Sequence, residues 1–133
     1  MTADKQPDLQ YDLRLRLYRG ERCFGPGVAQ LMHGVEQYGS IRAACRDMGM
    51  AYSKAWKILN RAEQDLNIHL IARESGGKNG GTAVLTPEGK AFLTRYDAFV
   101  QQVKQTADTL FAQLIQETTH EKQTTADLGT DID

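Results

Sequence analysis

The sequence predicts a mainly α-helical fold with a small amount of β structure, in a single domain of 133 residues. Several segments carry apolar residues at helical spacing, and turns rich in glycine or proline separate them. Two short stretches contain the alternation and turn residues typical of β-hairpins. The last helical segment is much longer than the others. A chain of this length can bury one hydrophobic core but not two.

The N-terminal part of the chain predicts a β-hairpin. Residues 11–18 alternate strictly between apolar and polar side chains, a period of two that predicts a half-buried strand. Arg19-Gly20 predicts the turn into a short return strand at 21–24. Residues 1–10 show no periodicity, and we expect them to be disordered.

Two short helices are predicted next. Residues 26–38 place apolar side chains at helical spacing, and Pro26 suits the first turn of a helix. Gly39 predicts the end of this helix, and Ser40 predicts the N-cap of a second helix that ends at Gly49.

Residues 52–66 predict a third helix with two distinct faces. At about 100° per residue, four apolar side chains of this helix lie within about 40° of the direction of Ala55. These core positions are Ala55, Leu59, Ala62 and Leu66. The opposite face is polar, contains no acidic residue, and carries Ser53, Lys57, Asn60 and Gln64. Together with the preceding helix, this third helix is predicted to form a helix-turn-helix, the arrangement that places side chains in a DNA major groove.

A second hairpin and a final helix complete the predicted domain. Residues 68–73 and 82–85 predict antiparallel strands, and the loop between them contains four glycines. A two-stranded flap after the recognition helix is a wing. Thr86-Pro87 predicts the N-cap and first residue of the last helix. Residues 11–87 are therefore expected to form a winged helix-turn-helix domain.

The last predicted helix covers residues 88–116 and would measure about 43 Å at 1.5 Å per residue. Its apolar side chains form two stripes, more than packing against a small domain requires, so we expect the helix to form a homodimer. The predicted dimerisation residues are Phe92, Leu93, Tyr96, Phe99, Val100, Val103, Ala107, Leu110 and Leu114. Residues 117–133 are polar and acidic, and are expected to be disordered.

The net charge of −1 hides an uneven distribution along the chain. Residues 40–95 contain nine basic and five acidic side chains, a surplus of four positive charges. Residues 101–133 contain two basic and six acidic side chains. Because it is the local patch that meets phosphate, the basic middle segment is compatible with a nucleic-acid partner.

The third helix and the wing carry most of the predicted DNA contacts. Asn can read adenine and Lys can reach guanine in the major groove. The alternative for the helix is an ordinary solvated face, and the alternative for the wing is a hairpin tip without a partner. For Trp56, both core packing and contact with the DNA backbone remain open. The predicted DNA-binding residues are Ser40, Tyr52, Ser53, Lys54, Trp56, Lys57, Asn60, Arg61, Arg73, Lys78 and Asn79.

Other classes of function find little support. The three histidines show no metal-ligand spacing and no neighbouring nucleophile, so we expect no enzymatic activity. Cys23 and Cys45 fit free buried thiols, with a disulfide switch as the open alternative. No apolar run approaches the roughly 20 residues that span a membrane. With no apolar signal region, we expect a cytoplasmic protein without a membrane partner.

Residues 38–96 resemble the N-terminal DNA-binding domain of the ModE family of molybdate-responsive regulators. The resemblance rests on Gly-Ser-Ile at 39–41, Tyr-x-x-Ala-Trp at 52–56, the glycine-rich wing at 73–86 and Tyr96 in the following helix. The wing is the most specific of these elements. A looser resemblance to the DNA-binding domain of LysR-type regulators runs through the helix pair and residues 85–89.

The resemblance implies a dimeric regulator that binds a roughly palindromic operator on double-stranded DNA. Full-length ModE proteins continue into oxyanion-binding β-barrel domains, but no β-rich segment follows Leu114 here. We therefore expect no cofactor and no molybdate binding in this chain. The alternative hypothesis is a winged-helix interaction module that binds a partner regulator instead of DNA.

Overall fold

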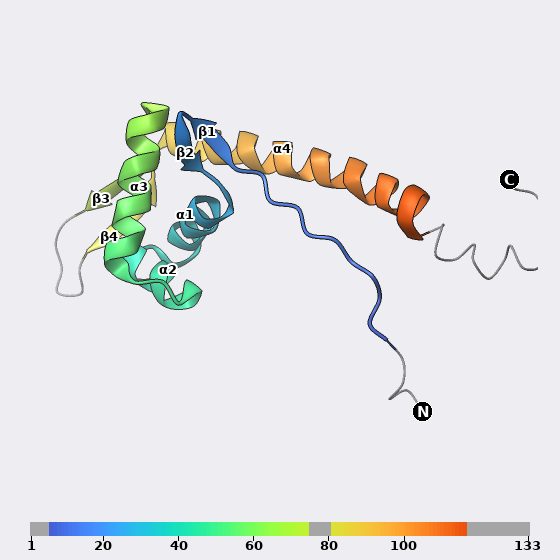
Figure 1. Cartoon of the computed structure of the whole chain (residues 1–133). Helices are drawn as coiled ribbons and strands as arrows, with labels where there is room; N and C mark the ends of the chain where they lie inside the picture. The colour runs from blue at the N-terminus through green and yellow to red at the C-terminus, as the bar shows by residue number, and fades with distance from the viewer. Residues whose placement is uncertain (1–5, 75–80, 117–133) are drawn as a thin grey trace, which may run out of the picture. The chain divides into compact units, whose positions relative to one another are not determined.

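The computed structural model describes residues 6–74 and 81–116. Its elements, in chain order, are β1 (Leu17–Arg19), β2 (Glu21–Phe24), α1 (Pro26–Tyr38), α2 (Ile41–Met48), α3 (Tyr52–Leu66), β3 (Ile71–Glu74), β4 (Thr82–Leu85) and α4 (Pro87–Phe111), followed by a π-helical turn (Ala112–Gln116) (Figure 1). The chain divides into two compact units: residues 14–98 form one, and residues 1–13 with 99–133 form the other.

The first unit is built around α1, α2 and α3. Leu31 and Met32 of α1 and Leu59 of α3 are almost completely buried. Helices α1 and α2 approach closely at Gly34, where a Cβ would lie 2.7 Å from the Cβ of Ala44. Small residues at this crossing therefore set the distance between the two helices.

The turns between these helices follow the predicted pattern. Gly39 and Gly49 end α1 and α2 with φ angles of 77° and 68°, in the left-handed region that favours glycine. Ser40 caps α2, because its Oγ accepts a hydrogen bond from the backbone N–H of Ala43 at 3.0 Å. The predicted bounds of α3 are confirmed at both ends.

The first hairpin is shorter than the sequence predicts. Strand β1 covers only Leu17–Arg19, so the prediction of a strand over residues 11–18 is wrong for its first six residues. The partner strand β2 has four residues and ends two residues before α1 begins, which leaves residues 11–16 no strand to pair with. The alternation reflects partial burial of Leu15 and Leu17, whereas Leu13 is 42% exposed.

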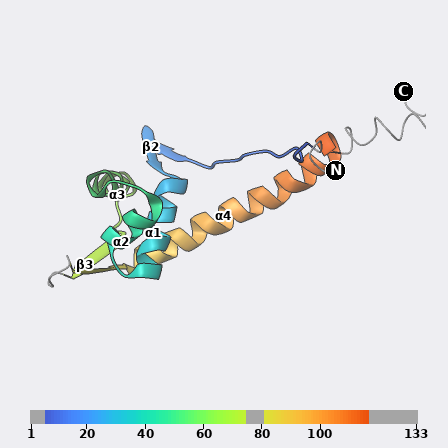
Figure 2. The same cartoon turned by 90° about the horizontal axis from the view of Figure 1, so that it is seen from below.

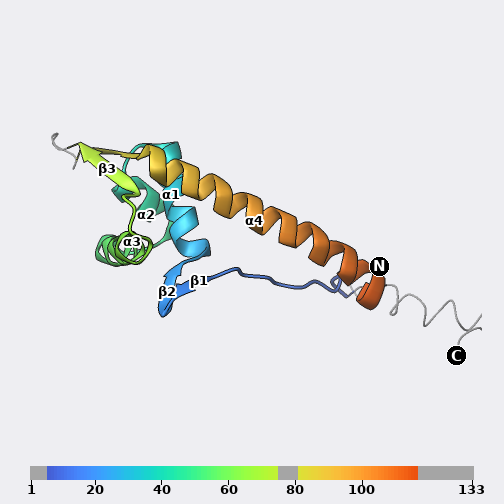
Figure 3. The ribbon, with the colours of Figure 1, turned by 90° about the horizontal axis from the view of Figure 1, so that it is seen from above.

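The wing begins three residues later than predicted. Strands β3 and β4 are antiparallel and pair Ile71 with Leu85 and Glu74 with Thr82. At the start of β3, the Glu63 carboxylate accepts the N–H of Leu70 at 2.7 Å and that of Ile71 at 3.3 Å. A side chain of α3 thus satisfies backbone groups where β3 begins and ties the wing to the helix. The two hairpins lie on different sides of α3 (Figures 2 and 3).

Helix α4 begins against the wing. Thr86 caps it by accepting the N–H of Gly89 at 2.8 Å, and its hydroxyl donates to the carbonyl oxygen of His69. One turn further on, Leu93 and Tyr96 are buried, with exposed fractions of 3% and 5%. The Tyr96 hydroxyl donates to the carbonyl oxygen of Leu15 at 2.7 Å.

Three of the predicted dimerisation residues contact the core of their own chain. Leu93 and Tyr96 pack inside the first unit, and the Phe92 ring lies edge-on to Phe24 with centroids 4.9 Å apart. The stripe at the start of α4 is therefore used by the core of its own chain, which the regular spacing of apolar residues did not reveal.

In the second unit, an N-terminal segment packs along α4. The Tyr11 ring lies 5.0 Å from that of Phe111, and its hydroxyl donates to the carboxylate of Asp108. This hydrogen bond raises the pKa of Tyr11 to about 12. Leu110 and Leu114 remain 47% and 64% exposed. Within the described residues, no helix is long and apolar enough to span a membrane.

Candidate nucleic-acid interface

The outward face of α3 is polar and exposed. Ser53, Lys57 and Asn60 are exposed, while Ala55 and Leu59 on the other side of the helix are buried. In the described part of the chain, no carboxylate forms an ion pair with Lys57. The helix therefore presents hydrogen-bond donors, with its apolar stripe holding it in the core.

Two aromatic side chains line one flank of α3, and an arginine guanidinium group stacks on each of them. Arg42 of α2 lies 4.2 Å above the ring of Tyr52, and Arg73 of β3 lies 4.6 Å from the ring centre of Trp56. Such cation–π contacts contribute about 0.5–1 kcal/mol at exposed sites. Trp56 is half-buried and acts as a platform that fixes the position of Arg73 beside α3.

The sequence did not reveal this pairing of arginine with aromatic residues. Stacking on Tyr52 gives Arg42 a defined place beside α3. A small cleft collects Ser40, Arg42, Tyr52 and Arg73 from α2, α3 and the wing. The cap at Ser40 uses its oxygen as an acceptor, and its hydroxyl hydrogen can still be donated.

Arg61 differs from the other predicted contacts because it is paired within the chain. Its guanidinium binds the Glu21 carboxylate of β2 and the Asp65 carboxylate, the latter at 3.0 Å. The hydrogen bond with Glu21, and then that with Asp65, raises the pKa of Arg61. Arg61 joins α3 to the first hairpin, so less of its charge is available to a phosphate. The predicted contacts Lys78 and Asn79 lie outside the described residues.

Both cysteines and two of the three histidines lie within the described residues, and His120 lies outside them. Cys23 and Cys45 are free thiols with exposed fractions of 5% and 4%, and burial raises the pKa of both. His33 lies 2.7 Å from the Asp97 carboxylate, and His69 lies 3.2 Å from that of Glu63. Among the residues that the structure describes, no three potential metal ligands cluster.

Comparison with known proteins agrees with this geometry. Residues 29–90, which contain α2, α3 and the wing, match the family described as "Bacterial regulatory helix-turn-helix protein, lysR family". The chain carries a helix-turn-helix region of the LysR and ModE type.

Curated relatives of this LysR/ModE-type region include molybdenum-related proteins. The "DNA-binding transcriptional dual regulator ModE" of Escherichia coli K12 is 32% identical over 103 residues, which cover 77% of this chain and 39% of that protein. The "Molybdenum-pterin-binding protein MopB" of Rhodobacter capsulatus is 37% identical over 79 residues, 59% of this chain and 29% of that protein. The chain thus spans about two fifths of the length of the ModE protein that it matches.

Solved structures show the same fold. A structure titled "Crystal structure of CbnR_DBD-DNA complex" aligns with a TM-score of 0.54 and 20% identity, covering 65% of this chain and 93% of that chain. The structure of CbnR, a LysR family transcriptional regulator, aligns with a TM-score of 0.51 and 21% identity, over 65% of this chain and 28% of that chain. The prediction of a winged helix-turn-helix fold is confirmed.

Proposed function

We propose that this protein is a dimeric transcriptional regulator that binds a roughly palindromic DNA operator. Helix α3 enters the major groove, where Lys57 and Asn60 contact base edges and Ser53 contacts a base edge or the backbone. Arg73 and the wing meet the flanking phosphates, and Ser40 contacts the backbone from the start of α2. Lys54, Tyr52 and Trp56 border the same face.

One observation carries this proposal: α3 presents an exposed, non-acidic face beside two stacked arginines in a domain of the LysR/ModE type. Arg42 and Arg73 are held beside α3 by Tyr52 and Trp56 before any ligand binds. Because these side chains are already ordered, less conformational entropy is lost on binding.

The exposed apolar side chains of the second unit support the dimer. Phe99, Leu110 and Leu114 are 48%, 47% and 64% exposed on a helix that also carries the half-buried Val103 and Ala107. Isologous contact between two copies would bury this stripe and set the distance between two recognition helices.

The first test combines selection of bound sequences from random DNA with binding measurements on the selected duplex. We predict that Asn60→Ala weakens binding to the selected duplex by about 1–3 kcal/mol, roughly 5- to 150-fold, and barely changes binding to random DNA. Lys57→Ala should weaken binding to the selected duplex comparably. Fluorescence anisotropy at several salt concentrations gives both quantities.

Gln30→Ala provides the matched control, because Gln30 is an exposed helical residue of α1. Its binding should equal that of the wild type on both duplexes. The proposal is wrong if the wild-type protein binds no DNA at micromolar concentration in low salt, or binds it without a dependence on salt.

A further inference from the structure

A hollow of about 490 Å³ lies between the first hairpin, the start of α1 and α3. Its lining combines cationic side chains with apolar ones such as Phe24, Met50 and Ile58. The six cationic residues are Arg14, Arg16 and Arg22 from the hairpin segment and Lys54, Lys57 and Arg61 from α3. We call this feature the hairpin groove. None of the sequence motifs pointed to it.

The hairpin groove gathers more positive charge than the protein neutralises. Glu21 and Asp65 both pair with Arg61. Across residues 6–74 and 81–116, no carboxylate forms an ion pair with Arg16, Arg22, Lys54 or Lys57. Side chains of like charge that line one concave surface raise its potential and attract anions.

The backbone around the groove positions these side chains. Gly25 lies directly under Arg16, since a Cβ at Gly25 would come 3.3 Å from the Arg16 Cγ. Buried Cys23 and Phe24 anchor β2 next to Arg22. The bond from Arg61 to Glu21 then holds the hairpin against α3. Arg22 of β2 and Arg16, which comes directly before β1, are therefore placed near the cationic side chains of α3.

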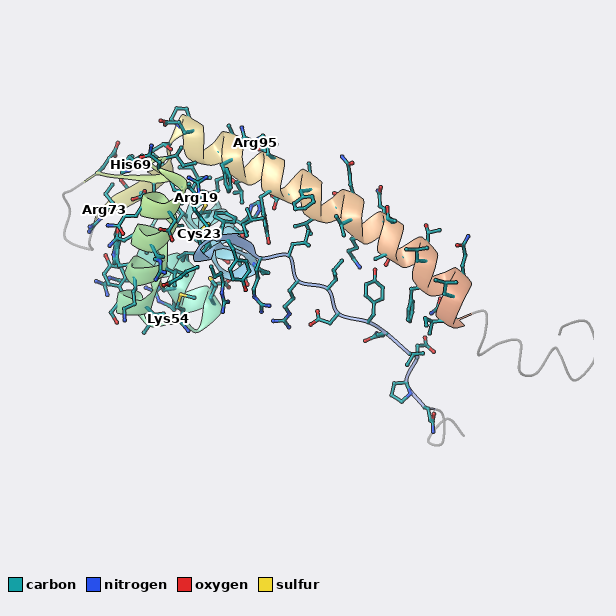
Figure 4. The ribbon with its side chains drawn as sticks, turned by 45° about the horizontal axis from the view of Figure 1, so that its top comes forward. Arg19, Cys23, Lys54, His69, Arg73 and Arg95 are labelled. Carbon is teal, nitrogen blue, oxygen red and sulfur yellow. The ribbon has the colours of Figure 1, made fainter. Side chains whose placement is uncertain are left out.

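The hairpin groove and the wing flank α3 on different sides. At about 100° per residue, Lys54 and Arg61 lie roughly opposite Tyr52 and Trp56 around the helix. Figure 4 shows Cys23 of the hairpin and Arg73 of the wing on different sides of α3. Lys57 belongs both to the groove and to the outward face of α3.

We propose that the hairpin groove binds the sugar–phosphate backbone of the same duplex whose bases α3 contacts. This inference rests on the proposed function. An anion in the groove would lie within one side-chain length of the face that meets the bases, because Lys57 serves both. The cationic side chains of the lining suit phosphates, and its apolar side chains suit deoxyribose. The recognition helix is then fixed between two backbone contacts, one from the wing and one from the first hairpin.

The test replaces Arg16 and Arg22 by glutamine and measures DNA affinity against salt concentration. Each lost phosphate contact lowers the slope of log K against log salt by about 0.9. We expect the double variant R16Q/R22Q to lose about 1–2 units of slope. Its affinity should fall by the same factor on the selected duplex and on random DNA, so that sequence discrimination is unchanged.

The matched control is R19Q/R95Q, which removes two exposed arginines that do not line the groove. It should keep the wild-type slope. Circular dichroism verifies that each variant is folded. If R16Q/R22Q does not fold, Arg22→Gln alone replaces it, with an expected loss of about one unit, and Arg22→Lys should restore the slope.

The two proposals fail in different ways. If R16Q/R22Q binds DNA with the affinity and the salt slope of the wild type, the groove proposal is overturned and the proposed function stands. Absence of any DNA binding by the wild type overturns both. A second measurement tests for a free anion: inorganic pyrophosphate is added, and the melting temperatures of the wild type and of R16Q/R22Q are compared. If pyrophosphate raises the melting temperature of the wild type alone, and R16Q/R22Q keeps the wild-type salt slope for DNA, the groove holds a free anion and the backbone assignment is overturned.

Discussion

Gly89 shows how one residue holds α4 against the wing. A Cβ at this position would lie 2.3 Å from the carbonyl oxygen of Leu70, a backbone atom that also accepts the N–H of Thr86 at 2.9 Å. We predict that Gly89→Ala lowers the free energy of unfolding by about 1–3 kcal/mol, because the backbone must shift to accept the methyl group. Urea unfolding followed by circular dichroism measures the change.

Gly27→Ala is the control for this prediction. Gly27 is also helical, but a Cβ there meets no atom within 4 Å. Its replacement should leave the protein equally stable or stabilise it by up to about 1 kcal/mol, through helix propensity. Equal unfolding midpoints for the two variants would show that the contact with Leu70 imposes no constraint.

At the scale of elements, the start of α2 depends on a single capping side chain. Ser40 is the N-cap, and its Oγ satisfies the N–H of Ala43. We predict that Ser40→Ala costs about 1 kcal/mol of unfolding free energy, as measured by thermal or urea unfolding. Ser53→Ala is the matched control. Because Ser53 is exposed in α3, its change should stay within about 0.5 kcal/mol. A stability loss of equal size in both variants would contradict the capping role.

The element predictions succeeded where the signal was local and long. Helix α3 has fifteen residues with a clear apolar stripe, and its bounds match the prediction at both ends. Strand β1 failed because a strand exists only where a partner is available, and β2 is too short to pair with residues 11–16. The start of β3 moved for the same reason, since its partner β4 ends at Leu85, opposite Ile71.

At the scale of the whole molecule, the dimer is the proposal that most needs a test. We predict that Leu110→Glu weakens self-association by about tenfold or more, because a carboxylate would have to be buried in an apolar interface. Sedimentation at several protein concentrations measures the dissociation constant. Leu110 is 47% exposed, so the monomer should remain folded.

Gln105→Glu adds the same charge on the opposite side of α4 and should not change self-association. At about 100° per residue, Gln105 lies roughly 140° away from Leu110 around the helix. A wild-type protein that stays monomeric at high concentration would contradict the dimer, as would equal weakening by both variants.

The sequence by itself determined the three-helix unit, its turns, the wing and the polar face of α3. These features follow from apolar periodicity, capping residues and glycine positions, all of which act over a few residues. The tertiary structure alone decided which apolar residues of α4 enter the core. It also decided how Arg42 and Arg73 stack on aromatic rings, and that three arginines and two lysines meet in the hairpin groove with Arg61. These outcomes depend on contacts between residues far apart in the chain, and no local pattern encodes the distance between them.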